Sequence, residues 1–103
     1  MREHFEHVSD DGNILLTIDK IADNTYRAVN NFTDITIKAI QLDEYRTKTE
    51  CIEHKTKGKD GKFRKSKKLM EHNTSWLLYM LEEYGFIKKR IPMNWGRILK
   101  NEN

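Results

Sequence analysis

Apolar side chains recur at a regular spacing through residues 14–42, and this spacing constrains the fold more than any other feature. Successive positions lie four and three residues apart, with Thr25 filling the one gap. The series comprises Ile14, Ile18, Ile21, Ala28, Phe32, Ile35, Ala39 and Leu42. Such a rhythm places apolar side chains on one face of an α-helix. The spacing therefore predicts helical structure.

Three arrangements satisfy this segment. One helix of about 30 residues can pair with a second copy as a coiled-coil homodimer, which suits a 3.5-residue period. Two helices can instead meet at residues 30–34, which are poor helix formers with capping side chains. A strand over residues 35–39 is the third arrangement, because β-branched residues alternate there. We favour the two helices, the second of which runs through Tyr45 toward His54.

The most strongly charged part of the chain is residues 55–68. Against Asp60 alone, it holds Lys55, Lys57, Lys59, Lys62, Arg64, Lys65, Lys67 and Lys68. Gly58 and Asp60-Gly61 predict a turn, so the flanks either pair as a short basic hairpin or form a mobile, solvated loop. Clustered basic residues bind phosphates by releasing counterions, and nucleic acid is the commonest such partner.

A helix over residues 76–84 is the clearest single element. Residues 72–75, His-Asn-Thr-Ser, offer N-terminal caps, and Gly85 stands where a C-terminal cap belongs. Lys88, Lys89 and Arg90 follow the negative end of this helix and extend the predicted nucleic-acid-binding set. After Pro92, residues 95–99 predict a short docking helix.

Residues 76–81 are six consecutive apolar residues, which leave this helix no polar face. Such a helix is either central to the fold or in contact with a partner. Aromatic residues and methionine are enriched in interface cores. The predicted partner interface comprises Trp76, Tyr79, Met80 and Trp95.

Two segments resemble parts of DNA-binding helix-turn-helix domains. Residues 76–90 resemble the end of winged-helix domains, where a leucine-rich helix closes with a glycine, two apolar residues and a basic strand. Residues 31–40, Asn-Phe-Thr-Asp-Ile-Thr-Ile-Lys-Ala-Ile, resemble the turn and recognition helix of bacterial repressors. The second resemblance implies that the DNA groove lies nearest Thr33, Asp34, Thr36 and Lys38.

The chain of 103 residues accommodates one domain, residues 1–103. We expect a mainly α fold, a small domain of three to four helices with or without the short basic β-hairpin at 55–68. The longest apolar run is far below the roughly 20 residues of a membrane span. A single cysteine excludes an intramolecular disulfide, and a reducing cytoplasm is the expected location.

No pattern in the sequence predicts catalysis, a metal or a cofactor. Cys51 and His54 are three residues apart, and either His72 or the pair His4 and His7 could complete a metal site. Zinc sites, however, usually show paired ligand motifs, and this chain has one cysteine. The five glycines are scattered and form no phosphate-binding loop. We therefore expect a protein that is not an enzyme.

Two functions remain. The first is a small nucleic-acid-binding regulator of transcription, with DNA as the expected ligand and the basic segment on phosphates. The alternative is a protein-binding adaptor or inhibitor that modulates a host enzyme or a nucleoprotein complex. The bias toward Lys, Asn, Ile, Asp and Glu is typical of AT-rich genomes, including those of many bacteriophages. A phage-encoded protein is one form of this alternative.

Overall fold

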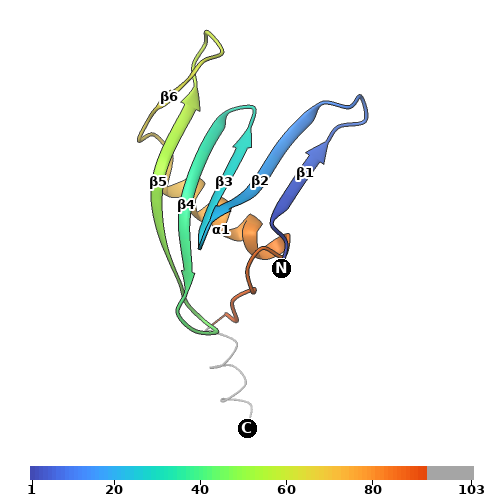
Figure 1. Ribbon diagram of the computed structural model, residues 1–103. Coiled ribbons are helices and arrows are strands. Elements are labelled where there is room, and N and C mark those ends of the chain that lie inside the picture. Colours follow the sequence, from blue (N-terminus) through green and yellow to red (C-terminus); the bar gives the residue numbers. More distant parts are fainter. Residues whose placement is uncertain (93–103) are drawn as a thin grey trace.

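In the computed structural model, which describes residues 1–92, the chain forms one antiparallel sheet and one helix (Figure 1). The elements are β1 (His4–Val8), β2 (Ile14–Ala22), β3 (Thr25–Asn30), β4 (Thr33–Gln41), β5 (Thr47–Lys57), β6 (Phe63–Lys65) and α1 (Met70–Glu83). The spatial order β1-β2-β3-β4-β5-β6 is the chain order, so each strand pairs with its sequence neighbour. The sheet is therefore a simple meander.

Helix α1 lies diagonally across one face of the sheet and leaves the other face open (Figure 1). It begins after the β6 edge and ends near β1, where the Arg2 backbone N–H donates to the Gly85 carbonyl at 3.1 Å. The buried core between the two layers comprises Ile18, Tyr26, Ala28, Ile35, Ile37, Ala39, Leu77, Leu78, Leu81, Phe86 and Ile87.

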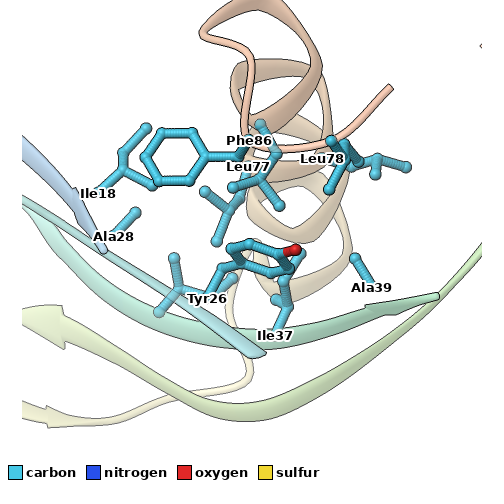
Figure 2. Packing of buried hydrophobic residues seen from close by; sticks show 11 residues of the cluster. Ile18, Tyr26, Ala28, Ile37, Ala39, Leu77, Leu78 and Phe86 are labelled. Carbon is cyan, nitrogen blue, oxygen red and sulfur yellow. The ribbon is translucent and has the colours of Figure 1, made fainter. Parts of the chain in front are cut away.

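Aromatic rings close the core at the end of α1. Phe86, directly after the helix, meets Tyr26 edge to face with ring centroids 6.1 Å apart. Figure 2 shows Phe86 and Leu77 reaching toward the sheet above Tyr26. Phe5 stacks on Tyr84 at 3.9 Å, which fastens β1 to the end of the helix. The segment after α1 is thus part of the core.

The prediction of a mainly α fold with three to four helices is wrong. Residues 14–42 contain β2, β3 and β4, so neither the long helix nor the two helices exist. Half of the apolar positions in the helical series are in fact exposed, at 54–74% of their surface. These are Ile14, Ile21, Phe32 and Leu42.

The buried residues follow the two-residue period of strands instead. In β4, Ile35, Ile37 and Ala39 all face α1, and Tyr26 and Ala28 do the same in β3. Side chains four residues apart share a face in a strand as well as in a helix, which is why the helical series looked regular. The third arrangement, a strand over residues 35–39, is confirmed.

The helix-turn-helix prediction is also wrong. Residues 31–40 form the β3–β4 turn and most of β4, and the described chain has one helix where that motif needs two. Thr33 is buried, and Asp34 accepts two hydrogen bonds from the Arg27 guanidinium at 2.9 and 2.6 Å. Within residues 1–92, no helix has the length and apolar character that crossing a membrane requires.

Helix α1 confirms the predicted helix but begins earlier, at Met70. The proposed caps at residues 72–75 therefore lie inside the first turns. The predicted cap at the other end is confirmed, because Gly85 has a φ of +78°. The Phe86 N–H donates to Leu81 at 2.9 Å, and the Gly85 N–H to Glu82 at 3.4 Å. These are the two bonds of a Schellman cap.

Candidate nucleic-acid interface

The basic segment is ordered as the β5–β6 hairpin, one of the two alternatives for residues 55–68. Lys55 pairs with Lys65 and Lys57 with Phe63 across the two strands. Paired residues share a face, so these four side chains lie on the open face of the sheet. The turn closes through the Gly58 N–H, which donates to the Lys62 carbonyl at 2.9 Å.

The tip of this hairpin projects beyond the β3–β4 turn (Figure 1). The Lys57 N–H donates to the Phe32 carbonyl at 2.9 Å, so Lys57 is level with that turn and residues 58–62 lie past it. Lys59 and Lys62 are carried on the tip and are exposed. The tip therefore carries two of the eight basic residues of the segment 55–68, together with Asp60.

Two of the eight basic residues in the hairpin region are neutralised locally. Arg64 donates to Asp60, and this hydrogen bond is the main reason that the pKa of the Asp60 carboxyl is lowered. Lys55 pairs with Glu53 at 3.0 Å. The other six have no ion pair with any residue among 1–92: Lys57, Lys59, Lys62, Lys65, Lys67 and Lys68. We call these six lysines the basic hairpin surface.

The second predicted basic group, residues 88–90, lies at the opposite end of the sheet. The Lys88 carbonyl accepts from Gln41 at 2.6 Å, beside the β4–β5 turn. The length of β5 puts this turn about 30 Å from the hairpin tip. Lys89 pairs with Glu83 at 2.7 Å, and Arg90 binds Glu82 through two nitrogens at 2.9 and 3.0 Å. The structure therefore does not bring the two basic groups together.

A groove of about 600 Å³ lies beside the basic hairpin surface, between the β3–β4 turn and the first turns of α1. Its lining consists of Asn30, Phe32, Thr33, Thr56, Lys57, Lys68, Leu69, His72, Asn73 and Trp76. Two of these residues are aromatic and two are lysines, and none of the ten described residues is acidic. The groove can therefore offer ring faces, hydrogen-bonding groups and positive charge together.

The β3–β4 turn holds Phe32 firmly at the mouth of this groove. The Asn30 side-chain oxygen accepts from the backbone N–H of both Phe32 and Thr33 at 2.8 Å. The Phe32 carbonyl is fastened to β5 by the bond from Lys57. Phe32 as a whole is 74% exposed. A large aromatic side chain is thus displayed to solvent on a rigid backbone.

The helical wall of the groove is fixed by a chain of hydrogen bonds through a buried histidine. His54 Nδ1 lies 2.7 Å from the Ser66 carbonyl, which can only accept, so Nδ1 carries the proton. Its Nε2 accepts from the Asn73 amide at 2.9 Å. This chain joins β5, the segment after β6 and the first turn of α1. Both ring nitrogens of His54, one of the metal-ligand candidates, are therefore engaged in hydrogen bonds within the protein.

Leu69 sits at the start of α1 in a left-handed conformation, with φ 61° and ψ 17°. Leucine rarely adopts this conformation, because its Cβ crowds the backbone. The side chain is 61% exposed, so core packing does not account for the strain. Strained residues of this kind cluster at binding sites.

The predicted partner-interface residues of α1 are split between two faces. Trp76 and Met80 are half-buried and pack against the core, whereas Tyr79 is 53% exposed on the outer side. Trp76 also lines the groove. Trp95 and the helix predicted over residues 95–99 lie outside the described residues.

The remaining candidate ligands do not assemble into a metal site among residues 1–92, where no three His, Cys, Asp or Glu side chains converge. Cys51 is half-buried on β5, and burial raises the pKa of its thiol. His4 on β1 is bound to Asp19, a hydrogen bond that raises the pKa of its imidazole.

The groove residues Asn30, Phe32 and Leu69 were not among the predicted site residues. The sequence carries a signal for the first two, because residues 30–34 are poor helix formers and predict a break between elements. Nothing local indicated that this break would lie beside the start of α1. Comparison of the chain with known protein families, curated proteins and solved structures found no match.

Proposed function

We propose that the protein binds nucleic acid through the basic hairpin surface. One observation carries the proposal: six lysines without an ion pair among the described residues lie on a single projecting hairpin and on the segment that follows it. Lysine ammonium groups on flexible stems suit the irregular spacing of phosphates. A protruding two-stranded ribbon is also narrow enough to enter a groove of a nucleic acid.

Counterion release gives this proposal a quantitative expectation. If about five lysines contact phosphates, affinity for a single strand falls roughly 100-fold between about 50 and 200 mM salt. A duplex, with its higher charge density, shows a steeper fall for the same number of contacts. Fluorescence anisotropy with a labelled single strand, a duplex and an RNA hairpin measures these slopes.

Matched variants locate the surface. The triple substitution Lys59→Ala, Lys62→Ala and Lys65→Ala removes three charges from the hairpin. A control, Lys20→Ala, Lys38→Ala and Lys48→Ala, removes three exposed charges elsewhere on the sheet. We expect the hairpin variant to flatten the single-strand salt slope by about 2, and the control to leave it unchanged. Equal effects of both variants would refute a localised surface.

A third variant tests the distant basic group. Lys88→Ala combined with Lys89→Ala leaves binding of a short ligand unchanged if that ligand contacts the hairpin alone. Loss of affinity in this variant for long ligands only would add residues 88–90 to the interface. The separation of about 30 Å makes the length dependence decisive.

A second candidate function, capture of a protein partner, is favoured by one observation. Tyr79 is 53% exposed in the middle of α1, whereas its apolar neighbours Leu78 and Leu81 are buried. Tyrosine is among the residues that dominate binding energy in protein interfaces. The proposal predicts that Tyr79→Ala abolishes capture of the partner and keeps the melting temperature. Unfolding of this variant would instead assign Tyr79 to the core.

A further inference from the structure

We propose that the groove between the β3–β4 turn and α1 holds an unpaired nucleobase against Phe32 and Trp76. The protein would then bind single strands in preference to duplexes. This inference rests on the proposed function and adds a site and a ligand class to it. The basic hairpin surface contacts the phosphates, and the groove accepts a base only when that base is unpaired.

The aromatic residues of the groove give the first support for a bound base. Phe32 is 74% exposed, yet its backbone is fixed by Asn30 and by Lys57. Exposing such a ring costs hydrophobic free energy, and rigid exposed rings serve as stacking surfaces for bases. Trp76 contributes the second ring from the helical wall. Every base has a π-face, so such a site needs no particular sequence.

The size and polarity of the groove carry the second step. Its volume of about 600 Å³ is in the range of small-molecule sites, about 300–1,000 Å³. Thr33, Thr56 and His72 line the same space, and side chains of these types can hydrogen-bond a base edge. A protein ligand filling this space with an aliphatic side chain would leave these polar groups without partners.

Charge complementarity carries the third step. Lys68 lines the groove. Lys57 also borders it, although its side chain lies on the open face of the sheet, with Nζ 5.6 Å from the centroid of the Phe63 ring. Neither lysine pairs with an acidic group among residues 1–92, and the described lining holds no acid. A base in the groove would therefore bring its own phosphate and that of its neighbour toward positive charge.

Base pairing determines whether a base can enter the groove, and so whether single or double strands bind. In a duplex each base is stacked on both faces and paired at its edge, so none can reach the rings without unstacking. An unpaired base is free to enter. The geometry therefore favours single strands and single-stranded loops.

The fluorescence of Trp76 reports occupancy directly. The chain has two tryptophans, and Trp95→Phe leaves Trp76 as the sole indole. We expect an oligothymidylate of about 12 nucleotides, within known single-strand site sizes, to quench this fluorescence at saturation. A duplex of equal length should not. Unchanged fluorescence with saturating single strand would overturn the inference.

Substitution of Phe32 supplies the second test. Phe32→Ala should weaken single-strand binding about tenfold, the order expected from losing one stacked base. The salt slope should stay constant because no charge is removed. Phe32→Tyr should retain affinity. Tyr79→Ala, which removes an exposed ring outside the groove, is the matched control and should have no effect.

The outcomes separate this inference from the proposed function. If duplex and single strand bind equally and Phe32→Ala is neutral, the groove is not a base site, although a steep salt slope would still support the basic hairpin surface. If no nucleic acid binds at about 50 mM salt, both proposals fail. Loss of folding in Phe32→Ala, seen by circular dichroism, would contradict the description of Phe32 as an exposed platform.

Discussion

The ion pair between Glu82 and Arg90 is expected to hold the segment after α1 in place. The Glu82 side chain is only 6% exposed, and that of Arg90 is 38% exposed. The carboxylate accepts three hydrogen bonds, all from Arg90: from Nε at 2.9 Å, Nη2 at 3.0 Å and the backbone N–H at 2.8 Å. Arg90→Met removes the first two bonds and the charge but keeps the aliphatic stem.

Arg90→Met should lower the free energy of unfolding because it leaves the buried Glu82 carboxylate without its cation. Breaking a fully buried pair costs about 3–5 kcal/mol, so the partial exposure of Arg90 reduces the expected loss to about 2–3 kcal/mol. A loss of this size lowers the melting temperature by roughly 10 °C or more in a domain of about 100 residues. Lys89→Met is the matched control, since its pair with Glu83 is exposed and worth about 0–1 kcal/mol.

The pH dependence of the loss provides the sharper test. Burial raises the pKa of Glu82, but the hydrogen bonds and charge of Arg90 outweigh burial, so that the pKa is lowered from 4.5. In the wild type, this group therefore contributes stability above pH 4.5 that is lost as pH falls through the lowered pKa. In Arg90→Met, the backbone N–H of residue 90 and Lys89 still favour the charged form, but the guanidinium no longer offsets burial, so the pKa of Glu82 rises from its wild-type value. The destabilisation is then full at neutral pH and shrinks as acid protonates Glu82.

Urea unfolding followed by circular dichroism at neutral and acid pH measures both free energies of unfolding. We expect the difference between wild type and Arg90→Met to be smaller at the acid pH. If Arg90→Met costs no more than Lys89→Met, or if its cost is independent of pH, the reasoning about the buried pair is refuted.

Two further predictions concern backbone conformation. Gly85→Ala should cost about 1 kcal/mol, because its φ of +78° disfavours any Cβ although the space around it is open; an unchanged urea midpoint would contradict this. Leu69→Gly should stabilise the protein by about 0.5–1 kcal/mol, because it relieves the left-handed conformation without removing a buried side chain. A lower melting temperature for that variant would show that the contacts of the leucine side chain outweigh the backbone strain.

Local chemistry made some elements predictable from sequence. A glycine directly after a leucine-rich helix supplies the left-handed residue that a helix end needs, and Gly85 has that role. The turn at Asp60-Gly61 was predictable for the same reason, since Gly61 has a φ of +81°. Each of these features depends on residues that are adjacent in the chain.

The strands were less predictable from the sequence. A strand over residues 35–39 was one of three arrangements, because Ile35 and Ala39 fit a helical and an extended spacing equally well. The strand is selected by strand pairing on both of its sides, where Ile35 pairs with Ala28 of β3 and with His54 of β5. Intrinsic helix preference is weak beside such pairing.

The features of the candidate site also separate into those that depend on adjacent residues and those that depend on residues distant in the chain. The sequence by itself determined the basic charge of residues 55–68, the turn within them and the glycine cap after the helix, because composition and short-range backbone chemistry suffice for these. Only the tertiary structure decided that Phe32 and Trp76 line one groove and that residues 88–90 lie far from the hairpin. Those relations depend on strand register and on the direction in which α1 crosses the sheet, and both are set by contacts between residues distant in the chain.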